Sequence, residues 1–180
     1  MKPLVLMLFT ALAAQAAAVQ LCTGKFTLID NSALIRGQAI VTRAFAEADI
    51  RVEWLSEREC KDAPGSIRVM LDAKAPQRFG LATMGYAMPY GSGAAVHIFY
   101  DRIREEHRSD FALILGYAMA HEIAHSIEGL ARHGERGIMK ANWTTDDYYV
   151  MRRGRLNFDS QDIELMQLGL RHAVQGSARQ

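Results

Sequence analysis

The sequence has almost no net charge and no hydrophobic run long enough to cross a membrane. Its 21 basic and 20 acidic residues give a net charge of +1. Proteins that bind nucleic acid usually carry a basic excess that neutralises phosphates, and polybasic proteins of the membrane surface carry one as well. The composition therefore predicts no nucleic-acid partner and no electrostatic attachment to a membrane.

Proline-rich linkers, repeats and low-complexity stretches are also missing, and only four of the 180 residues are proline. Hydrophobic residues make up 49% of the chain and charged residues 23%, which is an ordinary globular composition. A domain usually has about 100–200 residues. We therefore expect one folded domain, which acts as a monomer.

The N-terminal segment is typical of an export signal. A short basic start precedes an apolar run over residues 4–14, which is shorter than the about 20 residues that a spanning helix needs. Two overlapping A-x-A cleavage patterns end at Ala16 and Ala18. We predict a signal peptide over residues 1–18 and a mature domain over residues 19–180. The mature domain would be periplasmic or secreted, without stable membrane insertion.

Two cysteines remain after this cleavage, Cys22 and Cys60. Exported proteins meet an oxidising environment, in which an even number of cysteines favours disulfides. We therefore predict one disulfide between them, with two free, buried thiols as the alternative.

The spacing of apolar residues predicts both strands and helices. We expect Asn31 or Ser32 to cap the first helix, and Gly129 to end the second. The order of elements predicts a mixed sheet packed on helices, in an α+β or an α/β fold, of which we expect α+β. The expected strands lie at residues 25–29, 51–55, 67–71, 81–88 and 94–100, and the expected helices at residues 33–48, 110–128 and 160–171.

The second helix carries the motif with the clearest chemistry, H-E-x-x-H at His121, Glu122 and His125. Positions i and i+4 lie on one face of a helix, so both imidazoles can bind one Zn²⁺. Zinc lowers the pKa of a bound water to about 7, and the neighbouring carboxylate can take its proton. The motif therefore predicts a hydrolase in which Glu122 activates a zinc-bound water.

A catalytic zinc has three protein ligands and one open position. His133 is the preferred third ligand, because the chain can turn back toward the metal after Gly129. The alternatives are Glu164 on the last helix and the aspartates Asp146 and Asp147.

The residues from His121 to Met139 resemble the metzincin zinc peptidases, and most closely the short exported bacterial forms of the matrixin-like type. The resemblance rests on the H-E-x-x-H motif, Gly129, His133 and the turn at 137–139 that would form the Met-turn. Gly129 and His133 follow His125 by four and eight residues, where the family pattern has three and six.

This resemblance implies a zinc-dependent metalloendopeptidase that cleaves peptide or protein substrates. His121, His125 and His133 would bind the metal, and Met139 would lie in the hydrophobic floor beneath it. The implied fold has a mostly parallel sheet of four to five strands, a backing helix, the active-site helix, the Met-turn and a C-terminal helix. An edge strand would bind the substrate in extended form.

Two further readings stay open. The chain could be a non-catalytic exported binding protein stabilised by zinc, which a fourth protein ligand at the metal would favour. It could also be a zinc amidase acting on a non-peptide amide, which only a substrate panel separates from a peptidase. Near the motif, Trp143 would brace the Met-turn, and Tyr148 or Tyr149 could hydrogen-bond a tetrahedral intermediate.

Overall fold

The computed structural model describes residues 17–24, 29–63, 65–89 and 93–177. Its strands are β1 (Ala17–Thr23), β2 (Ile50–Leu55), β3 (Ile67–Asp72), β4 (Gly85–Ala87) and β5 (Ala95–Phe99). Its α-helices are α1 (Asn31–Ala46), α2 (Tyr100–Glu106), α3 (Phe111–Glu128), α4 (Thr145–Arg152) and α5 (Ser160–Ser177). Two short 3-10 helices, η1 (Glu59–Asp62) and η2 (Arg108–Asp110), complete the described elements.

The five strands form one sheet in the order β2-β1-β3-β5-β4. All neighbouring pairs are parallel except β4 and β5, so β4 is an antiparallel edge strand. Side chains alternate along β3, where Ile67 and Val69 are buried and Arg68 and Met70 are exposed. The predicted mixed, mostly parallel sheet of an α+β fold is thereby confirmed.

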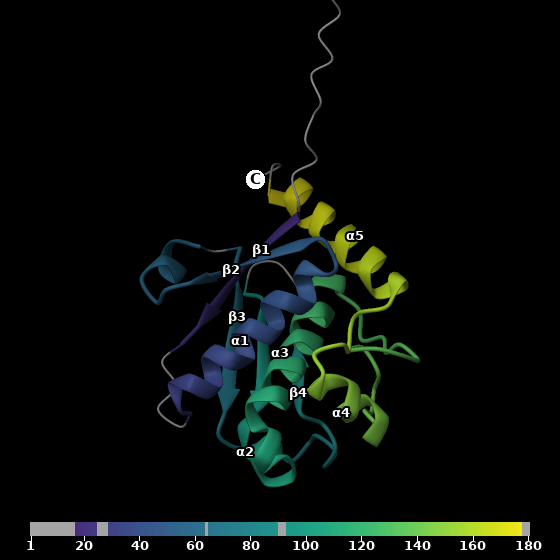
Figure 1. Cartoon of the computed structure of the whole chain (residues 1–180). Coiled ribbons are helices and arrows are strands. Elements are labelled where there is room, and N and C mark those ends of the chain that lie inside the picture. The colour runs from purple at the N-terminus through teal and green to yellow at the C-terminus, as the bar shows by residue number, and fades with distance from the viewer. Residues whose placement is uncertain (1–16, 25–28, 64, 90–92, 178–180) are drawn as a thin grey trace, which may run out of the picture.

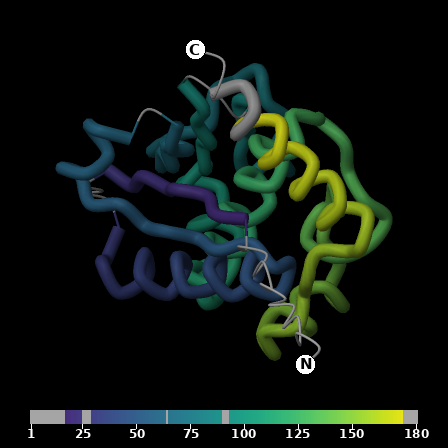
Figure 2. The backbone as a smooth tube through the Cα atoms, turned by 90° about the horizontal axis from the view of Figure 1, so that it is seen from above, coloured from purple at the N-terminus to yellow at the C-terminus, as the bar shows by residue number. Residues whose placement is uncertain are grey.

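Helices α1 and α3 lie side by side and pack together (Figure 1). Seen from above, α1 runs alongside β1 and β2 (Figure 2). Arg43 of α1 donates a hydrogen bond to the Tyr117 hydroxyl of α3 at 3.2 Å, and Phe45 and Met119 are fully buried in the shared core. Helix α5 packs against the C-terminal end of α3, where Gly169 lies against Ile127. The central helix α3 is therefore held from several directions.

Several boundaries differ from the sequence predictions. The strand expected at residues 25–29 falls largely outside the described residues, and the first strand of the sheet is β1. Helix α1 begins at Asn31 with Asp30 as the N-cap, and α5 continues beyond the predicted end to Ser177.

Helices α2 and α4 were not predicted. Both are short, and a helix of eight residues or fewer has few apolar positions from which a period can be read. Helix α4 has a readable signal all the same, because Thr144 and Asp147 form a capping box at its start.

Cys22 and Cys60 form the predicted disulfide, with their Cα atoms 5.8 Å apart. The bond joins the end of β1 to η1. Among the described residues, no helix combines the length and the apolar character needed to span a membrane.

Candidate functional site

Helix α3 presents the motif from the centre of the molecule. Every residue from Ile114 to Ala124 is buried, because the helix is apolar on nearly all sides and is covered by α1, β5 and α5. The helix ends at Gly129, which has a left-handed φ of 66° and donates its N–H to His125 O at 3.0 Å. The predicted helix end is confirmed, and the chain changes direction just after the motif.

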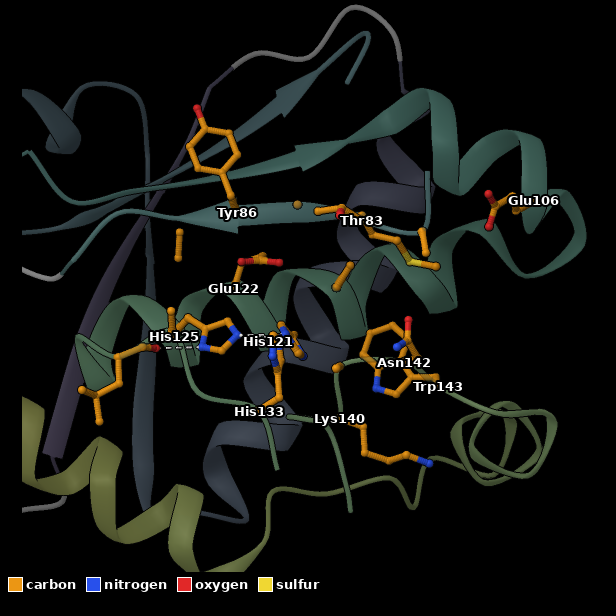
Figure 3. A pocket seen from close by; sticks show the side chains of 18 of the residues that line it. Thr83, Tyr86, Glu106, His121, Glu122, His125, His133, Lys140, Asn142 and Trp143 are labelled. Atoms are coloured by element: carbon orange, nitrogen blue, oxygen red, sulfur yellow. Dashed lines mark hydrogen bonds between the residues drawn. The ribbon is translucent and has the colours of Figure 1, made fainter. Parts of the chain in front are cut away.

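Three imidazoles meet at one point beside this helix (Figure 3). The Nε2 atom of His125 lies 3.0 Å from that of His121 and 3.3 Å from that of His133. One ligand nitrogen from each of the three lies within 4.8 Å of the others. The loop after Gly129 thus brings His133 to the two helical histidines despite its unusual sequence spacing.

Backbone carbonyl groups fix the tautomers of the two helical histidines. His121 Nδ1 lies 2.8 Å from Ile138 O, and His125 Nδ1 lies 3.0 Å from Leu130 O. A carbonyl oxygen only accepts, so each Nδ1 must carry the proton and each Nε2 must carry a lone pair. The lone pairs therefore point at one another, an arrangement that a cation between them relieves.

The three nitrogens fit a small tetrahedral metal ion. Nitrogens bound at the usual Zn–N distance in a tetrahedron lie about 3.3 Å apart, close to the separations found around His125. Imidazole ligands suit zinc, copper, iron and nickel. Among the described residues no fourth His, Cys, Asp or Glu joins the cluster, so a position remains for another ligand.

The surroundings keep these imidazoles neutral. Burial lowers the pKa of His121 to about 3 and the pKa of His125 to about 4. Burial also lowers the pKa of His133, with a smaller contribution from the neighbouring Arg132 cation. Neutral imidazole is the form that binds metal, so near neutral pH the cluster is ready to accept a cation.

Glu122 lies beside the cluster, between α3 and β4 (Figure 3). Its side chain is buried, and burial raises the pKa of Glu122 to about 8. Gly85 of β4 makes room for it: a Cβ on Gly85 would lie 2.9 Å from Glu122 Cγ and 2.6 Å from His97 O. A cation at the histidines would favour the carboxylate form and lower this pKa again.

The segment from Ile138 to Trp143, which contains Met139, packs against His121. Met139 is fully buried, and its carbonyl accepts the Gly134 N–H at 2.7 Å. Trp143 Nε1 donates to Ile138 O at 3.1 Å, and the Trp143 ring meets that of His121 edge to face at 5.9 Å. Trp143 therefore braces this turn as predicted and contacts one histidine directly.

A cleft of about 580 Å³ runs past the cluster. One wall is the segment from Ala82 to Ala87, which includes β4, and the other is the segment from Lys140 to Trp143. Lys140 is paired with Asp147, so its charge is compensated. The half-buried Tyr148 also lines the cleft, whereas Tyr149 is exposed and lies against Arg153.

The alternative third ligands do not join the cluster. Glu164 is exposed on α5, and Asp146 is exposed at the start of α4. Asp147 accepts the Thr144 N–H at 2.7 Å in the capping box and pairs with Lys140. His133 is the candidate that the fold brings to His121 and His125.

Some residues of the site were not predicted from the sequence. Gly85 is one of four glycines within residues 80–93, and nothing in the sequence distinguishes it from the others. The carbonyl groups of Leu130 and Ile138 leave no trace in residue types. Ser126 is fully buried and donates to Met88 O at 2.7 Å, which ties the end of the β4 segment to α3. Such contacts depend on tertiary packing.

The fold matches that of a solved metzincin. Archaemetzincin from Methanopyrus kandleri superposes with a TM-score of 0.52 and 15% identity, over 87% of this chain and 97% of that chain. Metalloproteinase-II from Bacteroides fragilis gives a TM-score of 0.43 and 12% identity, over 79% of this chain and 54% of that one. No sequence-family description and no curated protein matches the chain. At 15% identity the first likeness establishes the fold, and the activity has to be inferred from the site.

Proposed function

We propose that the chain is an exported zinc-dependent metalloendopeptidase of the metzincin type. The observation that carries the proposal is the convergence of three neutral imidazoles, His121, His125 and His133, beside the buried carboxyl group of Glu122 in one cleft. Zinc, when held there, supplies a Lewis acid that activates water near neutral pH and polarises a carbonyl group.

Glu122 moves the proton in this proposal. Its carboxylate takes a proton from the attacking water as the new C–O bond forms, and the resulting acid gives the proton to the leaving amide nitrogen as the C–N bond breaks. Its buried position between α3 and β4, next to the three histidines, supports this role, because a cation held there would favour the carboxylate form, which accepts the proton.

Strand β4 supports an extended peptide as the substrate. It is the edge of the sheet, and among the described residues it pairs with β5 alone. Its residues Gly85, Tyr86 and Ala87 line the cleft next to Glu122. A peptide added to this edge would satisfy the free backbone groups and pass the three histidines.

Tyr148 is the better placed of the two tyrosines for stabilising negative charge on the substrate oxygen. It lines the cleft, and burial raises the pKa of its hydroxyl group, which therefore stays protonated as a donor. Tyr149 does not line the cleft.

Export remains part of the proposal. The Cys22–Cys60 disulfide is compatible with an oxidising compartment. Strand β1 begins at Ala17, so a cut after Ala16 leaves the strand whole, whereas a cut after Ala18 removes its first two residues.

The test is Glu122→Gln in the mature protein, assayed on a library of quenched fluorescent peptides. General acid–base catalysis contributes about 10²- to 10⁴-fold, so we expect kcat to fall by at least 100-fold. Zinc content should stay at one ion per chain, since Glu122 is not a proposed ligand. Glu135→Gln, which changes an exposed carboxyl group on the loop, is the matched control and should leave both unchanged.

Other results would favour the other readings. Hydrolysis at the wild-type rate by Glu122→Gln would contradict the mechanism. One zinc per chain without cleavage of any peptide, but with cleavage of other amides, would indicate the zinc amidase. Bound zinc with no hydrolysis of either class would indicate the binding protein.

A further inference from the structure

His133 differs from the other two histidines in how it is held. His121 and His125 each donate Nδ1–H to a backbone carbonyl, whereas within the described part of the chain the hydrogen-bond contact found for His133 is with His125. Its side chain is also exposed. A histidine that binds metal almost always needs a partner that orients its ring. The orientation of His133 must therefore come from its own stretch of backbone.

Both chain neighbours of His133 are anchored. On one side, Gly134 donates its N–H to Met139 O at 2.7 Å and forms a bridge with Lys140. On the other side, Arg132 Nη2 donates to Asp162 Oδ1 in an ion pair with α5. The loop around His133 is thus tied to the Met139 segment and to a separate helix, α5.

Asp162 is a rigid anchor for this pair. Its side chain has no exposed surface, and its other oxygen accepts the Asp159 N–H at 3.2 Å, while Asp159 Oδ1 accepts the Asp162 N–H at 2.9 Å. These reciprocal bonds fix the first turn of α5. The carboxyl group that faces Arg132 therefore has little freedom to move.

A second acid lies near Arg132. Glu128, in the last turn of α3, has both carboxyl oxygens buried without a hydrogen-bond partner within the described ranges. Burial and the Asp162 charge raise the pKa of Glu128, the Arg132 cation lowers it, and the net result is a pKa of about 7. Arg132 thus lies between the end of α3 and the start of α5.

We propose that the Arg132–Asp162 ion pair is a positioning device for His133. By fixing the residue before His133 to α5, it directs the imidazole to the nitrogens of His121 and His125 across a connection longer than the usual metzincin spacing. This inference rests on the part of the proposed function that has the three histidines bind a metal ion. It does not depend on which bond is hydrolysed.

The direction in which zinc affinity changes when Arg132 is replaced distinguishes positioning from simple electrostatics. Arg132 is a cation next to a proposed cation site, so its charge alone repels the metal. Removing that charge should tighten zinc binding if electrostatics dominates. Removing it should weaken zinc binding if Arg132 holds His133 in place.

The experiment measures zinc affinity by chelator competition in the mature protein, for wild type, Arg132→Met and Asp162→Asn. Changes to groups that support a metal ligand typically cost 10- to 100-fold in affinity, and we expect that loss in both variants. Asp162→Asn removes the charge and keeps an oxygen for the cap of α5, so it guards against misfolding of Arg132→Met. The Co²⁺-loaded variants should also show weaker visible absorption, because they lose an imidazole ligand.

Two controls make the result specific. Arg136→Met changes an exposed arginine on the same loop and should stay within threefold of wild type. In a His133→Ala background, Arg132→Met should cause no further loss, because the group it positions is gone.

Equal or tighter zinc binding by Arg132→Met and Asp162→Asn would overturn the proposal. So would the same loss in the presence and absence of His133, which would show general destabilisation. A wild type that binds no zinc would overturn the proposed function itself, and would be seen before any variant is compared.

Discussion

Two regions of the molecule supply the three imidazoles, and they are built in different ways. His121 and His125 stand on α3, whose residues from Ile114 to Ala124 are all buried and whose geometry places positions i and i+4 on one face. His133 stands on the loop between Gly129 and Lys140, whose shape depends on a few contacts with distant segments. The helix is a preformed half of the site, and the loop has to be assembled around it.

The difference lies in what positions the histidines: local helix geometry positions His121 and His125, and long-range contacts position His133. A helix fixes the distance between its two histidines for any sequence that keeps it helical. The loop places His133 through contacts of its chain neighbours: Gly134 bonds to Met139 O, and Arg132 pairs with Asp162, which lies 30 positions further along the chain. The loop is consequently the part of the site that binding of a metal should change most.

Metal removal should separate the two regions most clearly. In the metal-free protein, the amides of Gly134 and Ile138, bonded to Met139 O and Asn157 O, should exchange with solvent far faster than those of α3. Zinc at 100 times its Kd adds about 2.7 kcal/mol, so it should slow exchange in the loop by about 100-fold. Hydrogen exchange followed by mass spectrometry measures both regions, and α3 should stay protected throughout.

The control is His133→Ala, in which zinc should no longer slow exchange in the loop. If α3 exchanged as fast as the loop in the metal-free protein, the distinction between a preformed helix and an assembled loop would be wrong.

Gly85→Ala should disturb the helical half without releasing the metal. The new Cβ would lie 2.6 Å from His97 O and 2.9 Å from Glu122 Cγ. The His97 carbonyl belongs to the backbone of β5, which cannot move away easily. We expect a loss of about 1–3 kcal/mol in folding free energy, as for overpacked sites, and a fall in kcat of roughly tenfold as Glu122 shifts. Thermal unfolding and peptide hydrolysis measure the two effects.

Gly80→Ala is the matched control, because a Cβ there meets only Thr83 Oγ1, at 3.9 Å. If zinc affinity fell together with kcat in Gly85→Ala, β4 would also support the histidines. That result would contradict the division of the site into a helix and a loop that hold the metal ligands.

Trp143→Phe should have the smallest effect of these substitutions. Trp143 contacts both halves of the site, through Ile138 of the loop and His121 of the helix. The substitution removes the Nε1–H donated to Ile138 O but keeps a ring against His121. Since Ile138 O still accepts from His121, we expect a loss of about 1 kcal/mol in folding free energy and little change in zinc affinity. Trp54→Phe, which removes a bond to Thr42 Oγ1 at 3.0 Å, is the control away from the site.

A drop in zinc affinity of more than tenfold in Trp143→Phe would contradict this expectation. It would show that the indole controls the direction of the Ile138 carbonyl, and through it the His121 ring.

Much of the fold could be predicted because its elements have strong local signals. Strand β3 alternates, α3 is long and apolar, and Gly129 ends it with a left-handed residue. The cysteines were paired correctly, because only two exist. Helix α4 was missed because its eight residues carry little periodicity, although the capping box at Thr144 marks its start.

The candidate site was predictable to the same extent. His121, Glu122 and His125 follow from a motif within one helix. The preference for His133 over Glu164 rested on the helix end at Gly129 and on the family resemblance, and the fold brings His133 to the cluster while Glu164 lies exposed on α5. Gly85 and the carbonyl group of Ile138 could not be chosen from the sequence, because their roles arise from contacts between distant segments.

The sequence by itself determined the features that depend on neighbours along the chain: the helix that aligns two histidines, the turn that ends it, and the near balance of charge. The tertiary structure decided which distant groups meet them. It placed a glycine against Glu122, a carbonyl group against each helical histidine, and a buried aspartate against the arginine before His133. The physical reason is that helix periodicity is a local constraint, whereas orienting a loop ligand requires hydrogen bonds and burial supplied by the rest of the fold.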